Sequence, residues 1–209
     1  MDLYLWSNPN LNNGESVPVK YSFNKGVTML IGSNGDGKSS ALSQIKSLFS
    51  ESGSWENIPE NDSIRNDYIP YLYDNVHEEK NAKSSWGFYG DYQKIAQTFE
   101  NSEGQDIFDF LYYKIGELGM TSRKAIRNHK KGVFFLFDGL DSGLSVDMLE
   151  KVKHEILDFI VENEKELDVY IICSANSYEF CSGYDCVDVK DGKSVSFDNY
   201  ESFFNYFCK

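Results

Sequence analysis

The sequence predicts an α/β fold in which a mainly parallel sheet is flanked by helices. Consecutive apolar residues at positions 133–137 and 169–173 are typical of strands that are buried on both faces of a parallel sheet. Segments with apolar residues at helical spacing alternate with these strands, as expected when helices cover such a sheet. A glycine-rich loop at residues 32–39 joins a further apolar run to one of the helical segments.

In the first part of the chain, strands are expected at residues 3–6 and 17–23, as a small antiparallel sheet at the N-terminus. A third strand is expected at residues 27–31, immediately before the glycine-rich loop. Apolar residues at helical spacing then predict a helix over residues 41–49. The pattern is weak from there to about residue 90, apart from one expected strand at residues 68–73.

In the second part, helices are expected over residues 106–118 and 149–160, and each has one apolar face. Each helix is followed in the chain by one of the two buried strands. Near the end, Asp191-Gly192 is a strong signal for a hairpin turn between strands at residues 187–189 and 195–197.

The composition is that of one ordinary globular domain. The chain has 209 residues, of which 41% are hydrophobic and 25% charged, so it can bury a core. We see no signal-like start and no apolar run near the roughly 20 residues that cross a bilayer, and we therefore expect a cytoplasmic protein with no membrane partner. The formal net charge of −13 opposes nucleic-acid binding, which would need a local basic patch.

The glycine-rich loop matches the pattern G-x-x-x-x-G-K-[ST] in full. Glycines in this pattern let the backbone curl so that several N–H groups point at phosphate oxygens. Lys38 would bring a positive charge to the β- and γ-phosphates, and the Ser39 hydroxyl would ligate Mg²⁺. The sequence therefore predicts that ATP and Mg²⁺ bind here. The expected nucleotide-binding residues are Gly32, Ser33, Asn34, Gly35, Asp36, Gly37, Lys38, Ser39 and Ser40.

A second acidic site is expected at Asp138, directly after the apolar residues 134–137. A phosphate-binding loop needs a carboxylate at the end of a neighbouring strand to organise Mg²⁺ and its water. An apolar run that ends in aspartate is a weak signal alone, because many strands end in this way. Together with the loop, it predicts that Ser39 and Asp138 hold the metal.

Three motifs resemble those of ABC-type ATPases. D-G-L-D-S-G-L-S at residues 138–145 resembles the family's Walker B motif and D-loop, which usually read D-E-P-x-S-G-L-D. The phosphate-binding loop looks like the family's G-x-N-G-x-G-K-S form. N-S-E-G-Q at residues 101–105 resembles the signature L-S-G-G-Q, although Ser102 and Gln105 also fit an ordinary capping box. The motifs follow the family's order.

The resemblance covers nearly the whole chain and implies a P-loop NTPase fold of the ABC-ATPase type. It implies one ATPase domain over residues 1–209, with a helical lobe at residues 51–120 that carries the signature. In ABC-type dimers, the signature helix caps the γ-phosphate bound by the other subunit. Ser102, Gly104 and Gln105 are therefore expected to complete the nucleotide site of a second copy in an ATP-dependent homodimer.

The branch that this chain resembles is that of the soluble SMC and RecF-like ATPases. A transporter ATPase normally has a glutamine loop between the phosphate-binding loop and the signature, and Gln93 and Gln97 lie too close to the signature for that role. The two early strands that lead into the loop look more like the ATPases of DNA repair and of bacterial or phage defence. The chain lacks the hundreds of residues that long coiled-coil arms need.

Two residues that the family uses for hydrolysis are replaced. Gly139 stands where the catalytic glutamate follows the Walker B aspartate, and loss of a general base commonly costs about 10²–10⁴ in rate. Asp141 could partly substitute for it. After the last buried strand, Ser174-Ala175 stands where the family has Thr-His, and Asn176 could take part of the histidine's hydrogen-bonding role. The expected catalytic residues are Lys38, Asp138, Asp141 and Asn176.

Three functions are compatible with these residues. The first is a slow soluble ATPase subunit of a DNA-repair or defence-type system, acting with an effector or nuclease. The alternative is a non-catalytic ATP sensor that presents a surface to a partner. A transporter ATPase subunit is the third, and the missing glutamine loop argues against it.

Two smaller features leave alternatives open. A basic cluster is either a solvated helix end with cations near its negative pole or a contact for nucleic acid or an acidic partner. It comprises Arg123, Lys124, Arg127, Lys130 and Lys131. One aromatic residue of the early strands could stack on adenine. The candidates are Tyr4, Trp6, Tyr21 and Phe23.

Overall fold

A computed structural model describes residues 1–9, 14–50, 58–75 and 103–208, and of residues 103–106 it describes the backbone alone. A six-stranded sheet forms the centre, in the order β4-β5-β6-β3-β7-β8. Neighbouring strands are parallel except for β7 and β8, which pair antiparallel as the expected hairpin. The strands are β3 (Gly26–Ile31), β4 (Tyr68–Asp74), β5 (Gly132–Asp138), β6 (Asp168–Ser174), β7 (Asp185–Asp188) and β8 (Ser194–Val195).

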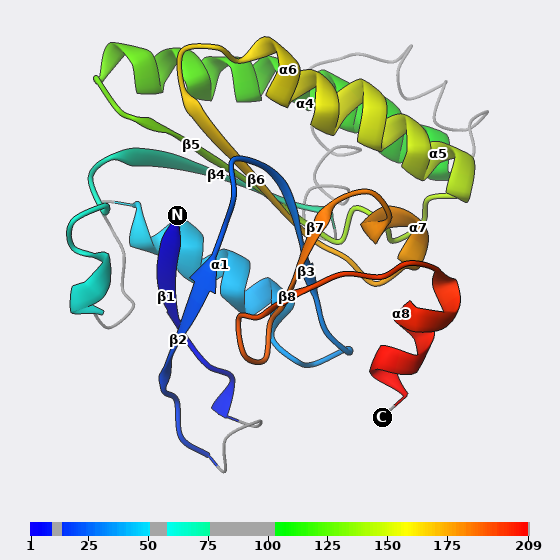
Figure 1. The fold of residues 1–209 in the computed structure, drawn as a ribbon. Helices are drawn as coiled ribbons and strands as arrows, with labels where there is room; N and C mark the ends of the chain where they lie inside the picture. The colour runs from blue at the N-terminus through cyan, green and yellow to red at the C-terminus, as the bar shows by residue number, and fades with distance from the viewer. Residues whose placement is uncertain (10–13, 51–57, 76–102, 209) are drawn as a thin grey trace.

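A small antiparallel sheet lies beside the central one, as predicted. It consists of β1 (Asp2–Trp6) and β2 (Pro18–Ser22), with Leu5 opposite Val19. This sheet lies on the same side of the central sheet as α1 (Lys38–Leu48) (Figure 1). The predicted fold class, a mainly parallel sheet with flanking helices and a small antiparallel N-terminal sheet, is therefore confirmed. The glycine-rich loop lies between β3 and α1, as expected for the P-loop fold that the sequence predicts.

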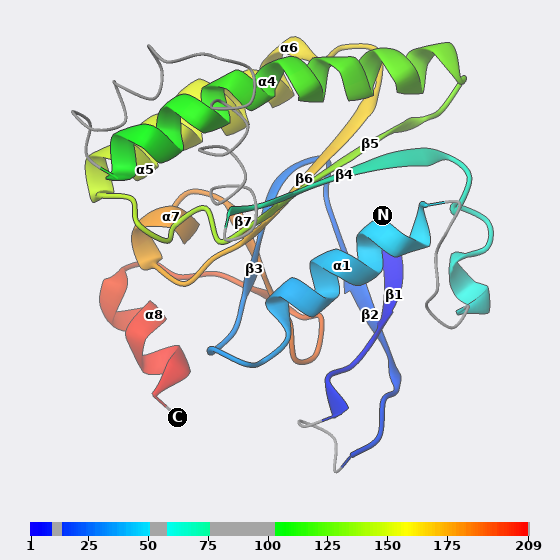
Figure 2. The same cartoon turned by 180° about the vertical axis from the view of Figure 1, so that it is seen from behind.

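The remaining long helices cover the opposite face of the central sheet (Figures 1 and 2). They are α4 (Glu103–Arg127) and a continuous helix made of α5 (Val146–Lys151), a π-helical segment (Val152–Asp158) and α6 (Phe159–Asn163). The short elements are a 3-10 turn (Pro59–Asn61), α7 (Tyr178–Cys181) and α8 (Tyr200–Phe207). No helix among the described residues is long and apolar enough to cross a membrane.

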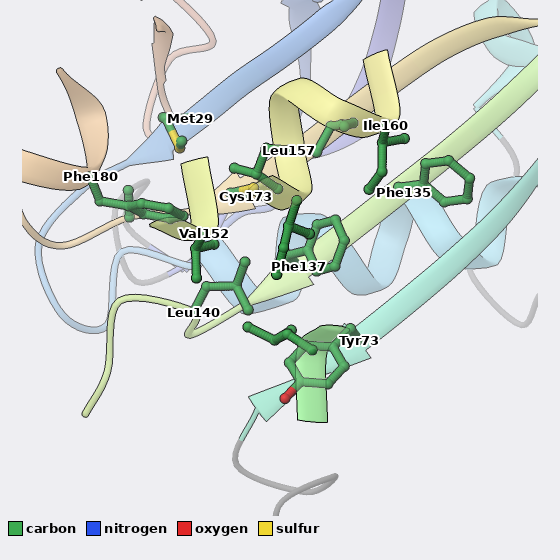
Figure 3. Packing of buried hydrophobic residues seen from close by; sticks show 14 of the residues in the cluster. Met29, Tyr73, Phe135, Phe137, Leu140, Val152, Leu157, Ile160, Cys173 and Phe180 are labelled. Atoms are coloured by element: carbon green, nitrogen blue, oxygen red, sulfur yellow. The ribbon is translucent and has the colours of Figure 1, made fainter. Parts of the chain in front are cut away.

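The alternation of side chains along β5 divides the core between the two faces. Phe134 and Leu136 pack with α1 and the small sheet, whereas Phe135 and Phe137 pack with α4 and the helix that begins at Val146. Figure 3 shows the second cluster, with Phe135 and Phe137 beneath that helix. Because every residue from 132 to 137 is buried, β5 is a strand with two covered faces, as its apolar run predicted.

The structure extends or corrects several elements. The helix expected at residues 106–118 runs from Glu103 to Arg127, and the second helix contains a π-helical segment that its apolar spacing did not reveal. Neither α7 nor α8 was expected. The strand expected at residues 68–73 is present and pairs with β5 in the central sheet. The rest of the expected lobe includes residues 51–57 and 76–102, which lie outside the described residues, so the lobe stays a prediction.

The aromatic stack around Phe134 gives a test of this core. Its ring lies between Phe49 at 4.8 Å and Tyr170 at 4.9 Å, and the side chain is fully buried. Phe134→Ala should lower the free energy of unfolding by about 3–5 kcal/mol, because it removes apolar contacts and leaves a cavity. Urea denaturation measures this change. Val146→Ala, at an exposed position, should change stability by no more than about 0.5 kcal/mol, and equal losses in the two variants would contradict the packing described here.

Candidate nucleotide-binding site

The candidate site lies where the carboxyl ends of parallel strands meet. β3, β5 and β6 run parallel, so Ile31, Asp138 and Ser174 end their strands at the same edge of the sheet. The glycine-rich loop follows β3 and leads into α1, which begins at Lys38. In open α/β sheets, this edge is the usual place for a ligand, and the N-terminus of the helix favours a negative charge.

The backbone of the loop favours glycine at three positions, and at the middle one, Gly35, φ is 90°. Gly37 precedes α1 with φ of 106°, a left-handed conformation that residues other than glycine rarely adopt. At Gly32, with φ of 156°, a Cβ atom would lie 2.8 Å from Val189 Cγ1, closer than carbon atoms approach, so the Val189 side chain would have to shift. Asn8, from the loop after β1, supports the turn by donating a hydrogen bond from Nδ2 to the Gly35 carbonyl at 2.8 Å.

The Lys38 ammonium group lies over the loop. Nζ donates to the Gly32 carbonyl at 2.6 Å and lies 3.3 Å from the Ser33 carbonyl. Burial lowers the pKa of Lys38 from its ordinary value, and the charges of Asp36, Asp141 and Asp138 act in the opposite direction. A phosphate at this position would add negative charge close to Nζ and favour the protonated amine.

Asp36 is used by the loop itself. Its Oδ2 accepts a hydrogen bond from the Ser33 backbone N–H at 2.5 Å and lies 3.2 Å from Lys190 Nζ. The carboxylate is buried, and Lys190 follows β7, so this ion pair ties the loop to the neighbouring strand. Asp36 belongs to the expected nucleotide-binding set, and its carboxylate contacts the loop's own backbone. Ser39 and Ser40 are exposed in the first turn of α1.

Ser174 connects the ends of β5 and β6. Its hydroxyl donates to Asp138 Oδ1 at 2.6 Å and accepts from the Gly139 backbone N–H at 2.8 Å. Gly139 has φ of 73°, again in the left-handed region. The residue after Asp138 therefore has a backbone that favours glycine, and its N–H points at Ser174.

Asp141 and Asn176 lie together, as two of the four expected catalytic residues. Asp141 Oδ2 accepts from the backbone N–H groups of Asn176 at 2.5 Å and Ser177 at 3.0 Å. Its Oδ1 accepts from Asn176 Nδ2 at 3.1 Å. The pair joins the loops that follow β5 and β6. Both side chains are engaged with each other here, and their catalytic roles stay predictions.

Asn75 is a site residue that sequence reasoning missed. It directly follows β4, it is buried, and its Nδ2 donates to the Gly139 carbonyl at 3.2 Å. Tyr73 donates its hydroxyl to the amide oxygen of Asn75 at 3.0 Å. A signal was present, because Asn75 is the polar residue after a strand, as Asp138 is at the end of β5. This signal could not be interpreted from the sequence, because it depends on the pairing of β4 with β5, in which Asp74 lies opposite Asp138.

A cavity of about 750 Å³ lies over the loop, within the range of small-molecule sites. Its lining brings together the loop from Asn34 to Ser40 with Asp138, Gly139, Ser174 and Asn176. Of the four aromatic candidates for adenine, Trp6 and Tyr21 also border the cavity. Tyr21 is almost fully buried and donates its hydroxyl to the Val189 carbonyl at 2.6 Å, whereas Trp6 is half-buried.

The signature residues lie partly outside the described ranges. Ser102 is not among the described residues, and Gly104 and Gln105 lie in the first turn of α4, where only the backbone is described. At the other end of α4, two members of the basic cluster contact the segment that leads into β4. Lys131 Nζ pairs with Asp67 at 2.5 Å, and Lys130 Nζ donates to the Asn66 carbonyl at 2.6 Å. Arg123, Lys124 and Arg127 are exposed.

No protein-family model matches the sequence, and no curated protein matches it significantly. Among solved structures, Stu0660 of Streptococcus thermophilus is 11% identical, with a TM-score of 0.45 over 100% of this chain and 81% of that one. cbiO1 of Clostridium perfringens, part of the ABC transporter complex cbiONQ, is 16% identical, with a TM-score of 0.37 over 91% and 83%. The ATP-binding cassette MJ0796, a dimer bound to ADP and Pi, is 13% identical, with a TM-score of 0.37 over 96% and 100%. These similarities are low, and the properties of the site follow from its own geometry.

The link between Asp141 and the loop after β6 can be tested directly. Asp141→Ala removes the acceptor of three hydrogen bonds and should lower the free energy of unfolding by about 1–3 kcal/mol. Native-state hydrogen exchange should show faster exchange at the amides of Asn176 and Ser177. Asp198→Ala, at an exposed aspartate, is the matched control and should change neither quantity. Unchanged protection of the two amides in Asp141→Ala would contradict this link.

Proposed function

We propose that this protein binds ATP with Mg²⁺ and is an ATPase of the ABC type. The observation that carries the proposal is the meeting of three groups at one cavity. Lys38 lies over the glycine-rich loop, Ser39 is exposed at the start of α1, and Asp138 ends β5, and all three line the same cavity. A buried cation, a hydroxyl and a carboxylate around curled backbone N–H groups suit a polyphosphate with its metal.

The donor chemistry fits Mg²⁺. Ser39 and Asp138 offer hard oxygen atoms, which this ion prefers, and it commonly takes only one or two protein ligands besides phosphate and water. Within the described ranges, no group of three or more His, Cys, Asp or Glu residues could hold a metal without such help. Ser39 and Asp138 would hold the ion, which when bound neutralises phosphate charge. Lys38 would bind and orient the phosphates.

Lys38→Ala should weaken ATP binding by about 10–100-fold, because one or two charge-assisted hydrogen bonds to phosphate would be lost. Titration calorimetry with ATP and Mg²⁺ measures the dissociation constant. Lys46→Ala, at an exposed position in the same helix, is the matched control and should leave affinity unchanged. If both variants bound ATP as the parent protein does, the loop would not be the phosphate site.

Hydrolysis is proposed to be slow. Gly139 offers no carboxylate to polarise water, and its N–H is bonded to Ser174. Asp141, the proposed partial substitute, accepts three hydrogen bonds from the loop after β6. We propose that ATP closes a head-to-head homodimer, in which Ser102, Gly104 and Gln105 of each copy complete the other's site. Slow hydrolysis would then reset a soluble SMC or RecF-like subunit of a repair or defence system that acts with an effector.

A non-catalytic ATP sensor is the second candidate, and Gly139 is the observation that favours it. Both functions need the same binding residues, and they differ only in turnover. A transporter ATPase subunit is less well supported. Such a subunit would need a glutamine loop and a docking surface for the helices of a membrane partner, and the residue that follows β4 is Asn75, with its amide directed at Gly139.

Light scattering over hours, with ATP and Mg²⁺, separates these functions. We expect a dimer that forms with ATP and decays slowly to monomer as phosphate is released. Lys38→Ala is the control and should remain monomeric throughout. A dimer that persists without phosphate release would favour the sensor. A monomer under all conditions would contradict the homodimer, and many turnovers per second would contradict slow hydrolysis.

A further inference from the structure

We propose that Ser174 is a positioning residue that determines which oxygen of Asp138 is available to the metal. This inference rests on the proposed binding of ATP with Mg²⁺. In the sequence, Ser174 stands out only as a departure from the family's Thr-His pair, and the structure gives it two specific contacts. Ser174 is buried, with 2% of its surface exposed, and it ends β6 next to the end of β5.

The two hydrogen bonds of Ser174 fix the direction of its hydroxyl proton. A serine hydroxyl has one proton to donate and lone pairs that accept. The Gly139 N–H can only donate, so the Ser174 oxygen must accept from it at 2.8 Å. The single proton is then directed to Asp138 Oδ1 at 2.6 Å. The hydroxyl therefore has one favourable orientation, because turning its proton toward Gly139 would place it against the Gly139 N–H proton.

This orientation makes the two oxygens of Asp138 unequal. Oδ1 is held by a buried hydroxyl, while the half-buried carboxylate still borders the cavity that Ser39 also lines. The oxygen that Ser174 does not hold is therefore the one that would contact the metal or its water. Groups that hydrogen-bond to metal-ligating carboxylates commonly change metal affinity by about 10–100-fold when they are mutated.

Ser174 also supports the turn after β5. The Gly139 N–H lies at a position with φ of 73°, and Ser174 is its partner there. Asn75 donates to the carbonyl of the same residue at 3.2 Å. The peptide groups on both sides of Gly139 are thus fixed by side chains from β6 and from the end of β4. These hydrogen bonds therefore also restrict the backbone of Asp138, one residue earlier.

The test compares nucleotide binding with and without the metal. The dissociation constant for ATP is measured by calorimetry in Mg²⁺ and in EDTA for the parent protein, Ser174→Ala and Ser174→Thr. Ser174→Ala should reduce the gain in affinity from Mg²⁺ by about 10–100-fold and leave binding in EDTA unchanged. Ser174→Thr keeps a hydroxyl at the same place and should restore the gain. Melting temperatures without nucleotide confirm that the variants are compared in the folded state.

Ser177→Ala is the matched control. Ser177 lies in the loop after β6, and its buried hydroxyl has no hydrogen-bond partner among the described residues, so this variant should behave as the parent. Equal losses in Mg²⁺ and EDTA for Ser174→Ala would indicate a general structural role and overturn the inference. So would an unchanged gain from Mg²⁺, or a loss in Ser174→Thr as large as in Ser174→Ala. No ATP binding by the parent protein in either buffer would instead overturn the proposed function, and this inference with it.

Discussion

The parallel pairing of β3, β5 and β6 is the constraint on which the rest of the structure depends. Because these strands run in one direction, their carboxyl ends share an edge, and the loops that follow them must meet there. Their side chains pack into buried clusters on both faces of the sheet, so a shift in register would remove core residues from their packing partners. Lys38, Asp138 and Asn176 are brought together by this register, although they lie far apart in the sequence. The site is a product of the sheet rather than of any one motif.

The proposed division between binding and hydrolysis follows the same geometry. The proposed phosphate site is the loop between β3 and α1, which is braced from neighbouring segments by Asn8 and Lys190. Activation of water would need groups from the loops after β5 and β6, and there the side chains hydrogen-bond to one another. Asp141 accepts from Asn176, and Ser174 joins Asp138 to Gly139. The glycine-rich loop is thus the part of the site suited to an anion, whereas the side chains after β5 and β6 already hydrogen-bond to one another.

Much of the fold could be predicted from the sequence, because the strands carry strong local patterns. Residues 133–137 and 169–173 are continuous apolar runs, and Asp191-Gly192 marks the turn between β7 and β8. α8 was missed because it is short. Its capping box, Asn199 with Ser202, is visible only once the helix is known, and its place is set by packing of Phe203 against Phe197. The π-helical segment was missed because buried positions at its spacing resemble those of an α-helix. In the site, the loop and Asp138 follow from motifs, whereas Asn75 and the links made by Ser174 depend on which strands are neighbours.

The conformation of Gly139 limits which residues can replace it. A substitution to glutamate would be opposed by the main chain rather than by its neighbours. The side chain would have space, since a Cβ atom at this position would come no closer than 3.8 Å to Asn75 Cβ, but the left-handed backbone would oppose it by about 1–2 kcal/mol. Introducing a carboxylate at position 139 would therefore require a change of the main chain as well as of the side chain.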